Sequence, residues 1–172
     1  VGANGTGKTT LFQTIFNNNN SSIEINENIK IGYLSQIQGQ TLNYSNTIAD
    51  EFFDIGFKTY DDIKEYLEGY NFDEELLNQK IGTLSGGEKN LIQLAKISEV
   101  GADLLLLDEP TSHLDTYSQI ALEKAIKNYK GAILMVSHDY YTIANCMDYV
   151  LFIENKKIRK ININHFKDII YA

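Results

Sequence analysis

A glycine-rich stretch near the amino terminus has the residue types and spacing of a phosphate-binding loop. Residues 2–9 read Gly-Ala-Asn-Gly-Thr-Gly-Lys-Thr and fit the P-loop pattern G-x-x-x-x-G-K-[ST]. Glycines let the backbone wrap closely around an anion, and the amides of the following helix point at phosphate oxygens. The predicted phosphate contacts are Gly2, Ala3, Asn4, Gly5, Thr6, Gly7, Lys8, Thr9 and Thr10.

Two of these residues have a specific chemical task in this pattern. Lys8 is expected to reach the β- and γ-phosphates of a nucleotide, and the Thr9 hydroxyl is expected to bind Mg²⁺. The alternative is a glycine-rich turn that only caps a helix. That alternative does not account for a lysine and a threonine at these two positions.

Polar side chains follow three further apolar segments of the chain. Gln36, Asp108-Glu109 and His138 each come just after an apolar run that is typical of a buried strand. Ligands of open parallel sheets bind outside the carboxyl ends of the strands, so these side chains are expected to meet the P-loop around one phosphate.

The chemistry of these side chains suggests their roles. Asp108 would bind Mg²⁺, and Glu109 would act as the general base on the attacking water. Gln36 would orient that water or complete the Mg²⁺ shell, and His138 would donate a hydrogen bond to the γ-phosphate. Alone, Asp-Glu-Pro can be a strand-to-turn junction and His138 a surface residue, but a P-loop in the same chain makes both readings minor.

Leu84-Ser85-Gly86-Gly87-Glu88 permits two interpretations. Ser85 and Glu88 have the spacing of a helix capping box, which is a purely structural role. That role does not explain Gly86 and Gly87, which each cost about 1 kcal/mol inside a helix relative to alanine. Paired glycines at a helix start can bind an anion, and their distance along the chain from the P-loop favours a nucleotide held by a partner.

Alternating helical and extended patterns predict an α/β fold in one domain, with a mainly parallel sheet flanked by helices. Helices are expected at 10–16, 48–55, 63–70, 85–98, 115–129 and 166–171, and strands at 23–25, 29–34, 104–107, 132–136, 149–153 and 156–161. The helices within about 40–100 are interpreted as a small helical subdomain. Only Val1 remains of the strand expected before the P-loop, which indicates an amino-terminally truncated fragment.

Composition and charge exclude some classes of function. The 172 residues carry a net charge of −8, which argues against a broad nucleic-acid binder. No apolar run approaches the roughly 20 residues that cross a bilayer, and a single cysteine, Cys146, fits a reducing cytoplasm. Ten carboxylates lie between Asp50 and Glu75 and are read as a solvated face. The alternative that this stretch binds a partner is left open.

Taken together, six motifs in order resemble those of the ABC ATPases. They are Gly2 to Thr9 (Walker A), Gln36 (Q-loop), Leu84 to Glu88 (signature), Leu105 to Pro110 (Walker B), Ser112 to Asp115 (D-loop) and Ser137-His138 (switch histidine). The resemblance covers essentially residues 1–172, as one partial ABC ATPase domain. It implies Mg²⁺-dependent hydrolysis of ATP. It also implies a second ABC ATPase domain, on the same polypeptide or in a homodimer, arranged head to tail. One domain's P-loop and the other's signature residues Ser85, Gly86 and Gly87 would then enclose each ATP, and Asp115 is also expected to contact nucleotide.

Two segments are most similar to the ABC-F branch of these ATPases, whose members are cytoplasmic and act on ribosomes, some conferring antibiotic resistance. They are residues 109–115 (Glu-Pro-Thr-Ser-His-Leu-Asp) and 137–141 (Ser-His-Asp-Tyr-Tyr). The short interval between Gln36 and Leu84 resembles the second domain of those proteins. Ribosome contacts would come from regions outside this fragment. The alternatives are the ATPase subunit of an ABC membrane transporter and a module that binds nucleotide only to dimerise.

Overall fold

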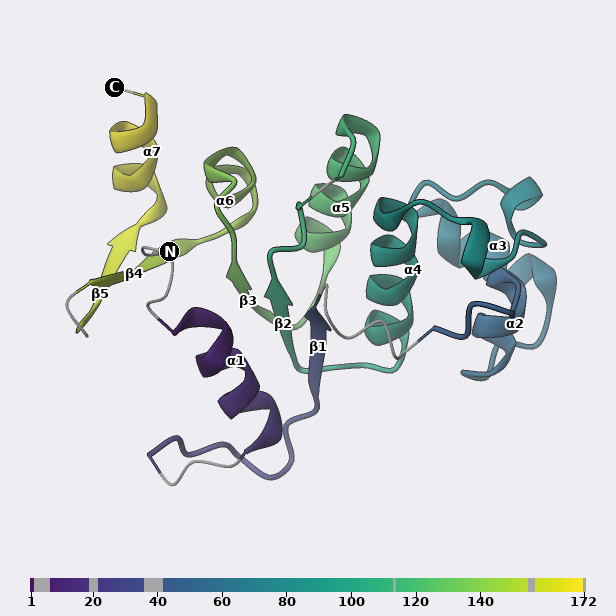
Figure 1. The fold of residues 1–172 in the computed structure, drawn as a ribbon, viewed down its shortest axis with the longest axis horizontal. Helices are drawn as coiled ribbons and strands as arrows, with labels where there is room; N and C mark the ends of the chain where they lie inside the picture. Colours follow the sequence, from purple (N-terminus) through teal and green to yellow (C-terminus); the bar gives the residue numbers. More distant parts are fainter. Residues whose placement is uncertain (2–6, 19–21, 36–41, 113, 155–156, 172) are drawn as a thin grey trace.

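A three-stranded parallel sheet forms the centre of the computed structural model, which describes residues 1, 7–18, 22–35, 42–112, 114–154 and 157–171 (Figure 1). The strands are β1 (Ile31–Ser35), β2 (Leu104–Asp108) and β3 (Ala132–Val136), in the order β1-β2-β3. Their register pairs Ser35 with Asp108 and Asp108 with Val136, so all three strands end at the same level.

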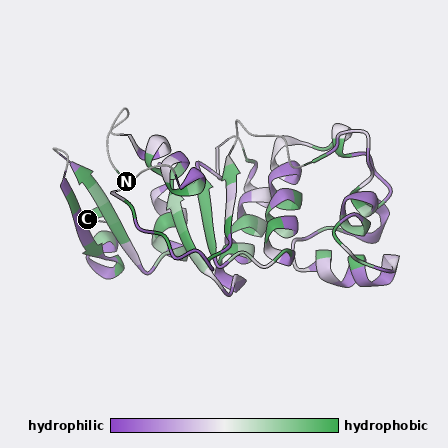
Figure 2. Ribbon diagram, turned by 90° about the horizontal axis from the view of Figure 1, so that it is seen from below, coloured by the Kyte–Doolittle hydropathy of each residue, from purple (hydrophilic) through white to green (hydrophobic). Residues whose placement is uncertain are grey.

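Helices cover both faces of this sheet. On one face, Phe12 of α1 (Lys8–Asn17) packs with Tyr33, Leu106 and Val136. On the other, Leu105 and Leu107 pack with α4 (Gly86–Glu99) and α5 (Thr116–Asn128). Strand residues alternate between the two faces, and the strands are correspondingly mostly hydrophobic in Figure 2.

The region between β1 and β2 is mostly helical and lies at the opposite end of the molecule from the termini (Figure 1). It contains α2 (Ile48–Phe53), α3 (Tyr60–Glu68), the short 3₁₀ helices η1 (Glu74–Leu76) and η2 (Ile81–Thr83), and α4. Thr47, Thr59 and Ser85 each begin a helix with a reciprocal capping box. The interpretation of residues 40–100 as a separate subdomain stays a prediction.

The carboxyl-terminal part forms a second layer beside the sheet. It consists of α6 (Tyr140–Cys146), the antiparallel pair β4 (Tyr149–Glu154) and β5 (Lys157–Asn162), and α7 (Ile163–Tyr171). Val1 runs parallel to β4, because its nitrogen donates to Leu151 O at 2.8 Å and its carbonyl accepts from Ile153 N at 2.9 Å.

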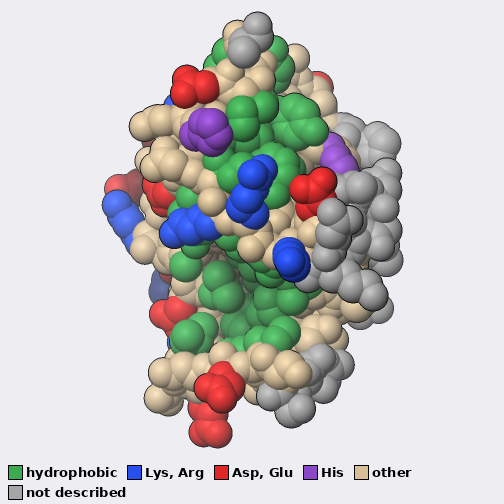
Figure 3. Space-filling view, turned by 90° about the vertical axis from the view of Figure 1, so that its left-hand side faces the viewer, with side chains coloured by type: hydrophobic (Ala, Val, Ile, Leu, Met, Phe, Trp, Pro, Cys, Tyr) green, Lys and Arg blue, Asp and Glu red, His purple; other side chains and the backbone are tan. Residues whose placement is uncertain are grey.

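A partly open cavity of about 440 Å³, lined by both apolar and charged residues, lies between β3 and β4. Residues of both strands line it, together with Val1, Phe12 and Cys146. Figure 3 looks from the side of β4, β5 and α7 and shows hydrophobic side chains exposed across the middle of that face. The sequence predicted a buried strand at 132–136. The strand is confirmed, but all its residues except Val136 remain partly or fully exposed beside this cavity.

The predicted helices and strands are confirmed with small shifts of their ends, except for one strand. Residues 23–25 form no strand. An Asx turn follows them, in which Asn28 N donates to Asn26 Oδ1 at 3.0 Å. Three alternating residues are too few to define a strand without a neighbouring strand to pair with.

Candidate functional site

The start of α1 follows a left-handed glycine and has no side-chain cap. Gly7 precedes the helix with φ +85°, a left-handed conformation that glycine adopts without steric cost, and it provides no side-chain cap. Lys8 begins the helix and is only 8% exposed. Thr9 and Thr10 follow in the first turn. Gly2, Ala3, Asn4, Gly5 and Thr6 lie outside the described residues.

Asp108 lies at the carboxyl end of β2, on the sheet face that α1 covers. It is two residues beyond Leu106 and therefore on the same side of the strand. The carboxylate is 8% exposed, and the Tyr33 hydroxyl of β1 donates to its Oδ2 at 3.3 Å. The predicted Mg²⁺ ligand is thus oriented by a hydrogen bond from the neighbouring strand.

Tyr33 was not among the site residues predicted from the sequence. The residue lies inside an apolar run, where a tyrosine is normally read as a core residue. In the register it pairs with Leu106, which brings its ring to the same face as Asp108. The only signal in the sequence was a hydroxyl-bearing side chain near the end of the strand that leads to Gln36.

Glu109 and His138, which the sequence placed after two different strands, are in direct contact. His138 N donates to Glu109 Oε2 at 3.2 Å, and His138 Nε2 lies 3.4 Å from Glu109 Oε1. Glu109 N donates to Val136 O at 2.8 Å, which fixes the turn after β2 against the end of β3. Both side chains remain partly accessible, at 26% for Glu109 and 52% for His138.

The backbone of Glu109 is in the left-handed region at φ +51°. A non-glycine residue there carries steric strain, and such strain is found preferentially at functional sites. The conformation turns the chain sharply after Asp108. As a consequence, the two consecutive carboxylates point in different directions: Asp108 contacts Tyr33, and Glu109 contacts His138.

Gln36 lies outside the described residues, but the residue before it does not. Ser35 is in register with Asp108. β1 therefore ends beside the end of β2, which carries Asp108 and leads into Glu109. The position of the Gln36 side chain stays a prediction.

The predicted signature residues start α4, and their side chains have different surroundings. Ser85 and Glu88 form a capping box, with Glu88 N donating to Ser85 Oγ at 3.2 Å and Ser85 N donating to Glu88 Oε2 at 2.7 Å. Gly86 faces open space. Gly87 is buried, and a Cβ at that position would lie 2.8 Å from Ser118 Oγ and 3.0 Å from Leu114 Cδ2.

The presence of glycine at position 87 therefore has a structural explanation that the sequence did not reveal. It allows α4 to approach the turn before α5 and the start of α5. The structural interpretation of Ser85 as a helix cap is confirmed. The contact of Ser85, Gly86 and Gly87 with a partner's nucleotide stays a prediction.

Asp115 caps α5 by accepting a hydrogen bond from Ser118 N at 2.7 Å. The hydrogen bonds from Ser118 hold the pKa of this carboxyl below its usual range. Because Ser118 also contacts Gly87, the D-loop and the start of α4 are packed against each other within one chain. The predicted contact of Asp115 with nucleotide stays a prediction.

The described residues include no group of three His, Cys, Asp or Glu side chains that could hold a metal ion by themselves. Mg²⁺ is commonly bound through one or two protein oxygens together with substrate phosphates and water. One buried carboxylate, Asp108, at a strand end fits that type of site. The residues present are thus compatible with Mg²⁺ bound together with a phosphate ligand.

Comparisons with known proteins agree with this arrangement. A family model described as "ABC transporter" matches residues 1–112. ABC transporter F family member 5 of Arabidopsis thaliana is 35% identical over 160 residues, which is 90% of this chain and 23% of that protein. The energy-dependent translational throttle protein EttA of Escherichia coli K12 is 32% identical over 160 residues, covering 88% and 28%.

The archaeal ribosome recycling factor aABCE1, solved in complex with the ribosomal stalk protein aP1, superposes with a TM-score of 0.75. Its sequence identity is 24%, and the match covers 100% of this chain and 35% of that one. This likeness confirms the P-loop α/β fold. The chain spans about a quarter of the length of the curated relatives above.

Among the helices of the described ranges, none combines the length and apolar character that crossing a bilayer requires.

Proposed function

The chain belongs to the ABC transporter family, and we propose that it is an ATP-binding and ATP-hydrolysing domain of an ABC-F protein. The observation that carries the proposal is the contact between Glu109 and His138 at the ends of β2 and β3. A carboxylate held beside an imidazole, at the sheet edge where α1 begins, suits the activation of water for attack on a phosphate.

In the proposed reaction, Lys8 and the amides at the start of α1 bind the phosphates of ATP. Glu109 accepts a proton from the attacking water, and His138 donates to the γ-phosphate. The strained backbone of Glu109 and the hydrogen bond from its backbone N–H to Val136 O fix the base relative to β3. Thr9, Gln36 and Asp108 are the residues that would hold Mg²⁺, which neutralises charge on the phosphates.

We further propose that two such domains face each other head to tail. Ser85 and Gly86 at the start of α4 are exposed, so a partner's ATP can reach them. The second domain would lie on the same polypeptide or on another copy. This arrangement makes hydrolysis at each site depend on both domains.

Glu109→Gln tests the hydrolytic assignment. A glutamine can still accept the hydrogen bond from His138 N, but it cannot take a proton from water. We expect ATP binding to be retained and turnover to fall by about two orders of magnitude or more. ATP titration and phosphate release on the full-length protein measure the two quantities.

Lys8→Ala provides the contrasting variant for that experiment. It removes a charge-assisted contact worth roughly 1.5–3 kcal/mol, so ATP affinity should fall about tenfold or more. Near-normal turnover of Glu109→Gln would exclude Glu109 as the general base. Unchanged ATP affinity of Lys8→Ala would exclude the P-loop assignment.

The proposed site of action is the ribosome, in the cytoplasm. The support comes from similarity to EttA, whose name describes a translational throttle. The net charge of −8 would repel RNA. Contact with ribosomal RNA is therefore assigned to regions outside these residues, with closure around ATP setting their geometry. Association with a membrane transporter is the alternative.

Sedimentation separates these two possibilities. Lysate expressing the full-length Glu109→Gln protein with ATP should yield ribosome-bound protein, because slow hydrolysis prolongs the ATP-bound state. Binding should weaken steeply with added salt, as phosphate contacts require. Recovery in the membrane pellet with a multi-span partner would instead support the transporter alternative.

A further inference from the structure

Glu51 is the exception among the ten carboxylates between Asp50 and Glu75. The other nine are exposed, as expected for a solvated face, whereas the Glu51 side chain is only 2% exposed. It forms an ion pair with Lys96 of α4, whose side chain is 14% exposed. A buried charge is tolerated when it is paired and hydrogen-bonded.

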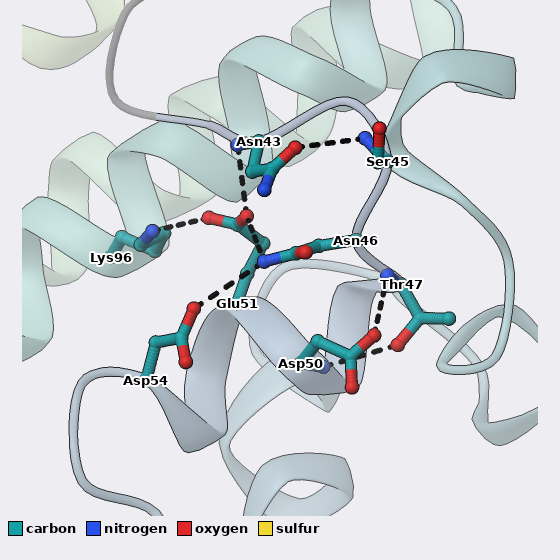
Figure 4. Close-up of polar contacts among 8 residues, drawn as sticks. All are labelled: Asn43, Ser45, Asn46, Thr47, Asp50, Glu51, Asp54 and Lys96. Atoms are coloured by element: carbon teal, nitrogen blue, oxygen red, sulfur yellow. Dashed lines mark hydrogen bonds and ion pairs between the residues drawn. The ribbon is translucent and has the colours of Figure 1, made fainter.

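The second oxygen of Glu51 binds the segment that follows the predicted Q-loop. Oε1 accepts from Asn43 N at 2.9 Å and from Asn46 Nδ2 at 3.0 Å, while Oε2 contacts Lys96 (Figure 4). Asn46 Nδ2 also donates to Asp54 Oδ2 at 3.3 Å. Glu51 thus joins residues 43–47 to the last turn of α4, accepting from three donors with its two oxygens.

The same residues 43–47 also contact the chain just before and at the start of α4. Ile81 N donates to Asn46 O at 2.9 Å, and Gly82 N donates to Tyr44 O at 3.0 Å. The Lys89 ammonium, in the first turns of α4, lies 5.0 Å from the centre of the Tyr44 ring. Residues 43–47 therefore touch both sides of the Ser85–Gly87 region, while Glu51 anchors them farther along α4.

From this arrangement we infer that Glu51 is a positioning residue that makes residues 43–47 and the start of α4 move as one unit. The inference rests on the proposed function, in which the chain from Gln36 responds to one ATP and Ser85-Gly86-Gly87 contact the partner's ATP. Through Glu51, a displacement of the segment after Gln36 is transmitted to the residues that complete the opposite site. Glu51 itself contacts no nucleotide.

Glu51→Gln in the full-length protein tests this role. Glutamine has nearly the same shape but only one oxygen, so it cannot accept from Asn43, Asn46 and Lys96 together. We expect kcat for ATP hydrolysis to fall about tenfold or more, as misplacement of a site component does, while ATP affinity changes less than about twofold. Lys96→Arg, which keeps the charge, should remain close to the wild type in kcat.

A matched control is available on the same region of the chain. Lys64 and Glu74 form an ion pair at 2.6 Å that is exposed, with side chains 39% and 67% accessible. Glu74→Gln makes the same chemical change without breaking a contact to α4. Its kcat and ATP affinity should equal those of the wild type.

Amide hydrogen exchange gives a readout that does not depend on turnover. In the wild type, ATP should change exchange in residues 43–47 and 79–86 together. In Glu51→Gln the change at 79–86 should no longer follow that at 43–47, at temperatures where unfolding curves show both proteins folded. Coupled exchange in Glu51→Gln, or an unchanged kcat, would overturn the inference. Absence of turnover in the wild type would instead reject the proposed function.

Discussion

At the scale of single residues, the consecutive carboxylates after β2 have separate environments. Asp108 is buried at the strand end and receives a hydrogen bond from Tyr33, whereas Glu109 turns away in a left-handed conformation and meets His138. This separation is what the proposed chemistry needs, because a metal ligand and a general base must face different parts of the substrate.

Tyr33→Phe should weaken the proposed Mg²⁺ site without removing a ligand. The variant loses a hydrogen bond worth about 1 kcal/mol, so Asp108 is held less firmly and the Mg²⁺ concentration at half-maximal ATPase activity should rise a few-fold. Titration of ATPase activity with Mg²⁺ at saturating ATP measures this concentration.

Tyr129→Phe is a matched control for that substitution. It removes the hydroxyl that donates to Ala102 O at 2.5 Å. Ala102 precedes the amino-terminal end of β2, whereas Asp108 lies at its carboxyl-terminal end. Its Mg²⁺ dependence should equal that of the wild type. An equal shift in both variants would mean that Tyr33 acts through general stability alone.

At the scale of elements, α4 is held near its start and in its last turn by different parts of the chain. Its first turn packs on Leu114 and Ser118 through Gly87, and its last turn binds Glu51 through Lys96. The helix that carries the predicted signature is thereby connected to the D-loop on one side and to residues 43–47 on the other. In the proposed head-to-tail arrangement, both connections would be routes by which the state of one nucleotide site reaches the other.

The two glycines at the start of α4 should respond differently to alanine. Gly87→Ala places a methyl group within 3.0 Å of Ser118 and Leu114, and overpacking of this kind costs about 1–3 kcal/mol. Gly86→Ala meets open space and should not destabilise the protein. Urea unfolding of both variants measures the difference, and equal stabilities would contradict the packing role of Gly87.

At the scale of the whole molecule, two buried groups, a thiol and a phenol, make the stability of the fold depend on pH in the alkaline range. Burial raises the pKa of the Cys146 thiol to about 11. Burial, reinforced by the hydrogen bond with Tyr70, also raises the pKa of the Tyr66 phenol. Cys146 lines the cavity between β3 and β4, and Tyr66 donates to Ala95 O of α4 at 2.8 Å.

The stability of the protein should therefore fall as the pH rises from about 9 to about 11. In that interval the unfolded chain has already released protons that the folded protein retains, and this favours unfolding. Urea unfolding at a series of pH values measures the slope. Cys146→Ala should reduce its magnitude, because one of the shifted groups is gone; an identical slope in that variant would contradict the assignment.

The sequence by itself determined the sheet edge and most elements around it. Apolar runs defined β1, β2 and β3, and Thr or Ser followed by Asp or Glu three residues later marks the capping boxes, which the sequence analysis recognised at Ser85. These features depend on neighbours within a few positions, so local chemistry suffices to recognise them. The placement of polar residues after the strands also predicted that Asp108, Glu109 and His138 belong to one region.

Only the tertiary structure decided which of these residues touch. The hydrogen bond from Tyr33 to Asp108, the contact of Glu109 with His138 and the burial of Glu51 against Lys96 join segments far apart in the sequence. Such contacts depend on strand register, on the backbone strain at Glu109 and on the packing of α4 against its neighbours. A carboxylate in an acidic stretch looks solvated until another element covers it, and for Glu51 that element is α4.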